Sequence, residues 1–342
     1  MAYFSRNICS NNSDIVLICL LYDNFGTPEK RSFMRNYTKR LLAVLIVGTA
    51  IFFAGCATED NVDSPPAPIA NIADIVARDP NFSMLNAAVT RAGLTSALTA
   101  NDITLLGADN LTFQVSGIPD IAAINAIPVA TLQAVLSYHI ITKRVSFAAV
   151  PATDTLKTVS TLNVYGSKNP NGTFFNGIKI RTPDKAGSNG YIQVLERVLT
   201  PPAPTKTIAN VFTTDTTFSF MLKAVTKLNL LTLLTNGNKL TVFAPNNAAF
   251  RATGITDVDA VPVAVLDAVI KGHIVGTNIF SSDFINTSVY PTKEPTLNVV
   301  LTTTPVLGVR FTTSAQPAAP ISLRDNVCTN GVIHTISRVM LQ

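Results

Sequence analysis

The chain has 342 residues, of which 47% are hydrophobic and 14% charged, so it is long and apolar enough for about two domains with sizeable cores. The net charge is +5, but residues 1–55 hold six Lys/Arg and three Asp/Glu, which leaves +2 for the rest. The body of the chain has no basic cluster interleaved with aromatic residues, and this pattern argues against nucleic-acid binding.

Residues 34–55 have the pattern of an export signal. Its basic start (Arg35, Lys39 and Arg40) precedes the apolar residues 41–53, a run of signal-peptide length that is short for a membrane-spanning helix. Phe53-Ala54-Gly55-Cys56 resembles a bacterial lipobox, although Phe stands where Leu is more common, so residues 34–55 are predicted to be a lipoprotein signal peptide. Cys56 is therefore expected to be lipidated and to begin the mature protein. The alternative is a short membrane anchor with an incidental Cys.

Two further segments flank this signal. Residues 56–68, which are polar and rich in Pro, are expected to form a flexible tether behind Cys56. Residues 1–33 place a second apolar run ahead of a signal that is complete from Met34. We interpret them as an extension from a misassigned start codon, and the alternative is an unusually long basic region.

The cysteines agree with export. Cys9 and Cys19 precede the signal and Cys56 is expected to carry lipid, which leaves Cys328 as the free thiol of the mature chain. Without an intramolecular disulfide, both domains must depend on their hydrophobic cores. Cys328 has no neighbouring His-Asp pattern and is interpreted as a small core residue.

The remaining chain repeats itself, with one copy over residues 69–202, a second over residues 205–342, and a short, stiff Pro-rich linker between them. Each copy is predicted to open with helices, to continue into a strand that ends at a sharp corner, and to add another helix. The corner residues of the second copy are Thr241, Phe243, Pro245, Asn246, Asn247 and Phe250. Pro245 cannot donate to a sheet, so the strand must stop there, and Asn246 or Asn247 is expected to cap the next helix.

The helix after the corner has an apolar face in both copies. Leu132, Val135, Leu136 and His139 follow helical spacing, and Leu266, Val269, Ile270 and His273 repeat it. Strands follow near residues 161–165, 177–181, 297–302 and 306–312. Each copy ends with an Asn-Gly hairpin signal before a last strand, at Asn189-Gly190 and at Asn330-Gly331. Helices followed by strands indicate an α+β fold.

Three of these segments resemble the fasciclin (FAS1) family: the corner at residues 241–250, the helix that ends in Tyr138-His139 or Gly272-His273, and the closing segment at residues 330–340. The resemblance covers residues 69–342. The first copy departs from it at Gly107-Ala108, where the family has Ala-Pro, and the second lacks the Tyr of the Tyr-His pair. The resemblance implies two tandem domains, each a β-sandwich or wedge packed against a helical layer. It also implies an extracellular role in adhesion or matrix binding without catalysis.

The candidate binding residues are few. The family resemblance links Tyr138 and His139 to partner binding, whereas a core His with one N–H on a backbone carbonyl explains His139 and His273 equally well. His334 is replaced by Gln193 in the first copy, so we infer that no property common to both domains depends on it. Arg197 and Arg338 recur in the closing segments and are interpreted as pairing at the sheet edge or binding a partner. The corner residues, His273, Asn330, Gly331 and Arg338 are otherwise taken as structural. The alternative for Asn246 and Asn247, and for their counterparts Asp109 and Asn110, is that they bind a ligand or a cation.

The sequence has no Gly-x-Ser-x-Gly elbow, no Walker loop, no His-Glu-x-x-His and no Gly-x-Gly-x-x-Gly after a strand, so we expect no enzyme activity, no cofactor and no metal site. The alternative is glycoside hydrolysis by two carboxylates, which need not be close together in the sequence. The predicted function is a lipid-anchored interaction or adhesion protein of the bacterial cell envelope, placed at the outer membrane and either periplasmic or surface-exposed. Its partner would be a protein or polysaccharide of the matrix, a cell surface or the envelope. The alternative is a surface or periplasmic binding protein for a glycan or a small molecule.

Overall fold

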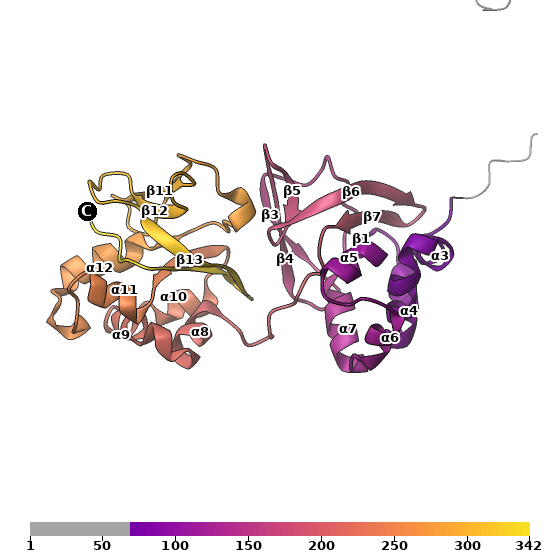
Figure 1. Cartoon of the computed structure of the whole chain (residues 1–342), viewed down its shortest axis with the longest axis horizontal. Helices are drawn as coiled ribbons and strands as arrows, with labels where there is room; N and C mark the ends of the chain where they lie inside the picture. The colour runs from indigo at the N-terminus through magenta and orange to yellow at the C-terminus, as the bar shows by residue number, and fades with distance from the viewer. Residues whose placement is uncertain (1–68) are drawn as a thin grey trace, which may run out of the picture. The chain divides into compact units, whose positions relative to one another are not determined.

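The structure is a computed structural model that describes residues 69–342. The predictions for residues 1–33, the signal peptide, Cys56 and the tether lie outside these residues. The described chain forms two similar domains (Figure 1). Among residues 69–342, no helix has the length and hydropathy needed to cross a membrane.

In domain 1, the helices and strands follow one another in the predicted order: helices, a strand, further helices and then the remaining strands. Its helices are α3 (Ile72–Arg78), η2 (Pro80–Phe82), α4 (Ser83–Ala92), η3 (Thr95–Thr99), α5 (Asn110–Val115), α6 (Ile121–Ala126) and α7 (Val129–Tyr138). Its strands are β1 (Ile103–Gly107), β2 (Ile140–Ile141), β3 (Thr153–Lys157), β4 (Asn163–Asn169), β5 (Gly172–Phe175), β6 (Ile178–Gly187) and β7 (Gly190–Leu195).

Domain 2 repeats this order. Its helices are α8 (Ile208–Thr214), η4 (Thr216–Phe218), α9 (Ser219–Lys227), α10 (Leu231–Asn236), α11 (Asn247–Ala252), η5 (Val258–Ala260), α12 (Val263–Gly272) and η6 (Ser281–Asp283). Its strands are β8 (Leu240–Pro245), β9 (Ile274–Val275), β10 (Val289–Pro291), β11 (Asn298–Thr302), β12 (Gly308–Phe311), β13 (Ala319–Cys328) and β14 (Gly331–Ile336). In Figure 1, helices α8 to α12 lie together on one side of strands β11 to β13.

Each domain has one seven-stranded sheet, and the strand order is the same in both. The order is β2-β1-β7-β6-β5-β4-β3 in domain 1 and β9-β8-β14-β13-β12-β11-β10 in domain 2. The first and last long strands pair in parallel, β1 with β7 and β8 with β14, while the other pairs are antiparallel. This mixed sheet with its helices confirms the predicted α+β class and the internal repeat.

The strand before the corner lies between two cores, because successive side chains of a strand point to opposite faces. In β1, Leu105 belongs to the core beneath the helices, and Leu106 belongs to a second core shared with strands β3 to β6. In β8, Val242 and Phe243 divide between the two cores of domain 2 in the same way. A strand buried on both faces explains the continuous apolar run in the sequence.

Helices α7 and α12, which carry the predicted apolar faces, bury these faces. In α7, Leu132 and Leu136 are buried in the helical core, and in α12 Leu266 and Ile270 take these places. Both helices begin after a proline, Pro128 or Pro262, which cannot continue a preceding helical turn. Both end at a histidine, so the two helices set the positions of His139 and His273.

Candidate partner-binding cleft

Tyr138 and His139, the predicted partner-binding pair, are both buried at the end of α7. The Tyr138 hydroxyl donates to the Asn163 carbonyl at 2.8 Å and accepts from Asn176 Nδ2 at 2.7 Å. His139 Nδ1 bonds the Val135 carbonyl at 2.7 Å, and its Nε2 accepts from the Leu199 N–H at 3.0 Å. Burial raises the pKa of Tyr138 to about 12 and lowers the pKa of His139 to about 4. These contacts serve the fold, and a binding role for the pair stays a prediction.

His273 makes the same contacts in domain 2. Its Nδ1 bonds the Val269 carbonyl at 2.7 Å, its Nε2 accepts from the Met340 N–H at 3.0 Å, and burial lowers its pKa to about 4. The missing Tyr has a packing explanation. A Cβ at Gly272 would lie 2.6 Å from the Phe311 ring, so in domain 2 this ring fills the space beside the helix end.

The two asparagines of the corner do different work. Asn246 is the N-cap of α11, and its Oδ1 accepts from the Ala249 N–H at 2.8 Å. Asn247 is the first helical residue and connects two helices, because its Oδ1 accepts from the Phe220 N–H at 3.0 Å and its Nδ2 donates to the Thr216 carbonyl at 2.9 Å. In domain 1, Asp109 is the cap and Asn110 makes the connecting bonds to α4 and η2.

The other corner residues are internal to domain 2. Thr241 Oγ1 donates to the Thr277 carbonyl at 2.7 Å and accepts from the Ile279 N–H at 2.8 Å. Phe243 stacks on His334 with ring centroids 5.5 Å apart, and Phe250 is fully buried. Pro245 is the last residue of β8. All described contacts of this corner therefore hold the domain together.

Asn330 and Gly331 lie at the hairpin between β13 and β14. Asn330 Oδ1 accepts from the Ile208 N–H at 3.0 Å, and its Nδ2 donates to the Leu234 carbonyl at 2.7 Å. The hairpin is thereby bonded to α8 and α10. A Cβ at Gly331 would lie 2.0 Å from the Leu240 carbonyl oxygen. Glycine is therefore needed for the close approach of β8, not for the turn.

The two domains contact each other through an aromatic cluster. Tyr165 of β4 lies against Phe280, with ring centroids 6.0 Å apart, and its hydroxyl donates to the Thr329 carbonyl at 3.1 Å. Asn169 Nδ2 donates to the Ser282 carbonyl at 3.1 Å and to Asp283 Oδ1 at 3.0 Å. Burial raises the pKa of the Asp283 carboxyl.

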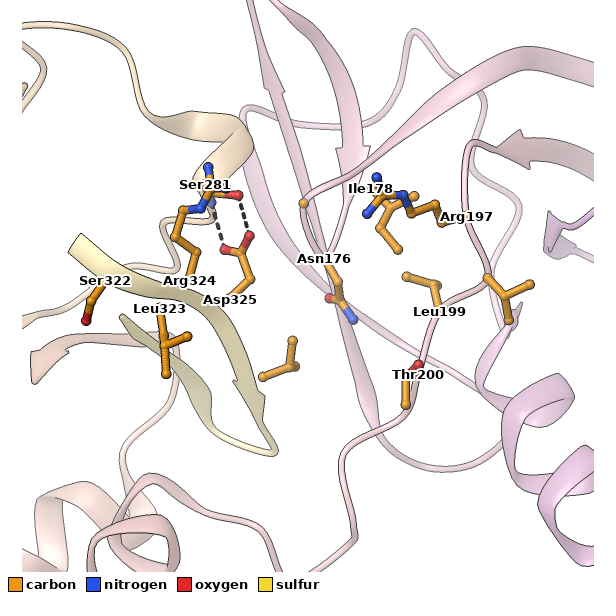
Figure 2. A pocket seen from close by; sticks show the side chains of 13 residues that line it. Asn176, Ile178, Arg197, Leu199, Thr200, Ser281, Ser322, Leu323, Arg324 and Asp325 are labelled. Atoms are coloured by element: carbon orange, nitrogen blue, oxygen red, sulfur yellow. Dashed lines mark hydrogen bonds between the residues drawn. The ribbon is translucent and has the colours of Figure 1, made fainter. Parts of the chain in front are cut away.

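A cleft of about 590 Å³ lies beside this cluster (Figure 2). One wall comes from domain 1 and carries Asn176, Ile178 and Arg197. The opposite wall comes from domain 2 and carries Ser281, Leu323, Arg324 and Asp325. Arg197 and Arg324 are exposed, and Leu323 is 67% exposed. The cleft therefore presents two guanidinium groups and an apolar side chain to solvent.

An irregularity in β13 builds the domain 2 wall. The pairing of β13 with β14 shifts register between Ile321 and Asn326, and Asp325 has a φ of 58°. The Asp325 carboxylate accepts from the Ser281 N–H at 2.8 Å and from its hydroxyl, so it is held in place (Figure 2). A bulge re-aims side chains, and here it leaves Leu323 and Arg324 at the surface.

The sequence indicates one side of this cleft and not the other. Arg197 was a candidate because it recurs as Arg338, but Arg338 is half-buried and does not line the cleft. Residues 322–325 were missed. In the sequence, these residues are visible only as a mostly polar stretch, Ser-Leu-Arg-Asp, between two predicted strands. Any strand with a solvent-exposed face has such a stretch, so it does not indicate a binding site.

The chemistry of the cleft favours anion recognition. Arginine offers a planar fork of donors to carboxylates and phosphates. Asp325 is the acidic residue of the lining, and its oxygens are already bonded to Ser281. Within residues 69–342, no group of three or more His, Cys, Asp or Glu side chains is arranged to hold a metal ion.

Comparison with known proteins identifies relatives. The sequence model of the Fasciclin domain matches residues 80–201 and 216–342. The transforming growth factor-beta-induced protein ig-h3 of Sus scrofa is 28% identical over 253 residues, which cover 73% of this chain and 35% of that protein. The protein of the same name from Oryctolagus cuniculus is 27% identical over 259 residues, with the same coverage. The chain thus spans about a third of the length of these relatives.

Among solved structures, the chain is similar to a FAS1 domain pair from the insect cell adhesion molecule fasciclin I. That match has 17% sequence identity and a TM-score of 0.38, and it covers 76% of this chain and 96% of the other.

Proposed function

This chain belongs to the fasciclin domain family, and from this premise we propose that it is a non-catalytic, membrane-anchored protein that binds a partner in a matrix, on a cell surface or in the cell envelope. Fasciclin domains are linked to cell adhesion and extracellular interaction, and proteins that contain them are generally non-enzymatic. We propose the partner of this chain and its membrane anchor from the observations that follow.

The observation that carries the proposal is the cleft between the domains. Its two exposed arginines, one from each domain, suit a partner that presents carboxylate or phosphate groups, and Leu323 adds apolar contact. An acidic polysaccharide or an acidic protein surface has this chemistry. Such a site would need both domains, because each supplies one of the two arginines.

The anchor is proposed from sequence. Lipidation of Cys56, after cleavage of residues 34–55, would place both domains outside the cytoplasm, with residues 57–68 as the tether. Two or more acyl chains are enough for stable membrane attachment. We propose the outer membrane of a bacterial envelope as the site, facing the periplasm or the exterior.

A binding assay with defined polymers tests the cleft. Both pairs of hydrophobic cores consist of described residues, so residues 57–342 contain what the two domains need to fold. This chain should bind an immobilised polyuronate and not neutral dextran. The double substitution Arg197→Gln and Arg324→Gln should weaken binding about tenfold or more.

Arg338→Gln is the control for Arg197→Gln made alone, because each removes one charge and Arg338 is the counterpart of Arg197 outside the cleft. It should leave binding unchanged within about twofold. Equal loss in the control and in the cleft variant would mean that general charge, not the cleft, attracts the polymer. Unchanged binding in the cleft variant would refute the proposed site.

A further inference from the structure

Domain 1 contains an apolar cavity that shares residues 198–200 with the lining of the cleft but contains neither of its two arginines. Its volume is about 310 Å³, and it lies among α4, α7, the end of α5 and the segment after β7. The floor is formed by buried residues of the helical core, among them Leu85, Phe113, Leu132 and Leu136. The rim is formed by Ser116, Thr131, Val135 and Thr200, which are partly or fully exposed.

The polar groups of the lining are mostly engaged inside the protein. His139 uses both ring nitrogens on backbone groups. Ser116 Oγ donates to the Thr112 carbonyl at 2.7 Å and accepts from the Val198 N–H at 2.9 Å. An apolar cavity of this kind does not hold ordered water, and it accepts apolar ligands.

Domain 2 carries larger side chains at several equivalent positions. Ala108, Ser116 and Thr200 of the cavity lining correspond to Pro245, Thr253 and Leu341. Leu341 packs against the helical core of domain 2. In domain 2 these larger side chains therefore occupy space that the smaller side chains of domain 1 leave open. An unfilled cavity costs stability, so the small side chains of domain 1 carry a cost.

We propose that this cavity binds the alkyl chain of a single-chain amphiphile, with the polar head at the rim in solvent. An engineered apolar cavity of about 150 Å³ takes benzene, so this volume is about twice what a compact ring needs. At roughly 30 Å³ for each methylene, similar to the volume of a water molecule, the cavity holds about ten carbons. Because the lining offers few free polar groups, chain length decides affinity, and the head group contributes little.

A chain-length series tests the inference with residues 57–342. Binding of the C6, C8, C10, C12 and C14 carboxylates is measured by calorimetry below their micelle concentrations. Each added CH₂ should tighten binding about fourfold until the cavity is full, near ten carbons, and further CH₂ groups should add little. Decanol should bind within about threefold of decanoate. Affinity that rises steadily to C14 overturns the proposal, and so does decanoate binding without decanol binding.

Substitutions at the rim locate the ligand. Thr131→Phe and Val135→Phe should weaken decanoate binding by about tenfold or more by blocking the entrance, while Ala134→Phe, the next position on the same helix but outside the lining, should not. Thr131 is exposed, so its variant keeps the core intact. Methyl NMR provides the second measurement: decanoate should shift Leu132 and not its counterpart Leu266. Shifts at both residues, or unaltered affinity in both blocking variants, overturn the proposal.

The two proposals fail separately. Arg197→Gln with Arg324→Gln should leave decanoate binding unchanged, and Val135→Phe should leave polyuronate binding unchanged. Loss of decanoate binding in the arginine variant would contradict a cavity that selects by chain length.

Discussion

Gln193 of β7 and His334 of β14 occupy equivalent positions and make the same pair of hydrogen bonds. Gln193 Oε1 accepts from the Asp184 N–H at 3.0 Å, and His334 Nδ1 accepts from the Asp325 N–H at 3.2 Å. Gln193 Nε2 donates to the Val145 carbonyl at 3.2 Å, and His334 Nε2 donates to the Ile279 carbonyl at 2.7 Å. A neutral imidazole offers one acceptor and one donor, and an amide offers both together with a second N–H, which Gln193 Nε2 donates to Asp184 Oδ1 at 2.7 Å.

The inference that no common property depends on position 334 is therefore wrong. Both side chains bond the irregular strand, β6 or β13, at an aspartate with positive φ, Asp184 or Asp325. They also bond the segment after the short strand, at Val145 or Ile279. Sequence comparison treats His and Gln as different chemistry, whereas the fold uses what they share.

The substitution His334→Gln should preserve the fold and make the protein less sensitive to acid. Burial lowers the pKa of His334 below the usual 6.5, and the pKa of His139 and His273 to about 4. The unfolded chain then binds more protons than the folded one below pH 6.5. Stability from these groups is complete above pH 6.5 and is lost as the pH falls toward 4.

Urea unfolding of residues 57–342 at about pH 4.5 to 7.5 measures this effect, because a histidine in the unfolded chain titrates within this range. The slope of unfolding free energy against pH should decrease in His334→Gln. At pH near 7, the loss of stacking on Phe243 should cost about 1 kcal/mol. A slope equal to that of the unmodified chain would contradict the assignment of His334 as an acid-sensitive group.

The substitution His273→Ala should destabilise domain 2 by about 1–3 kcal/mol, because the Met340 N–H and the Val269 carbonyl both lose a buried partner. Thermal unfolding measures the loss, and polyuronate binding at a temperature where the variant is folded serves as the control. A variant that unfolds normally but no longer binds would assign His273 to the binding surface.

The substitution Gly331→Ala should cost about 3 kcal/mol or more, because the new Cβ would lie 2.0 Å from the Leu240 carbonyl oxygen and force β8 and β14 apart. Gly254→Ala is the comparison. Gly254 has a φ of 82° and open space around a Cβ, so only backbone strain of about 1 kcal/mol applies. The denaturant midpoints of the two variants measure the two losses of stability. Equal losses would show that β8 and β14 move apart to accommodate the new Cβ at little cost.

The substitution Cys56→Ala in the full chain should abolish the proposed membrane attachment, because no acyl group can then be added. Cell fractionation with detection of domain 2 measures where the protein is found. Continued sedimentation of the variant with membranes, after a high-salt wash that removes charge-bound protein, would exclude the lipid anchor.

Much of the fold was predictable because it rests on local patterns. The apolar spacing of Leu132 and Leu136 gives the face of α7, and Pro245 marks the end of β8. The repeat itself doubled each signal. Short segments such as α6 (Ile121–Ala126) and β3 (Thr153–Lys157) carry little periodicity and were not predicted.

The candidate cleft was less predictable because it depends on contacts between distant residues. Arg197 and Arg324 are 127 positions apart in the sequence and belong to different domains. Asn247 looked like a second cap, yet its bonds reach Thr216 and Phe220, about a quarter of a domain earlier. No local pattern encodes such a pairing.

The parallel pairing of the first and last long strands has a consequence for synthesis. In domain 2, Leu240 pairs with Gly331, and β14 lies inside the sheet between β8 and β13. The sheet stays divided until residues 331–336 reach it, however early the helices form. A chain that is delivered from its N-terminus, by synthesis or by export, supplies β7 (Gly190–Leu195) before domain 2. The chain can thus finish one repeat before the other begins, which keeps two similar sheets from exchanging strands.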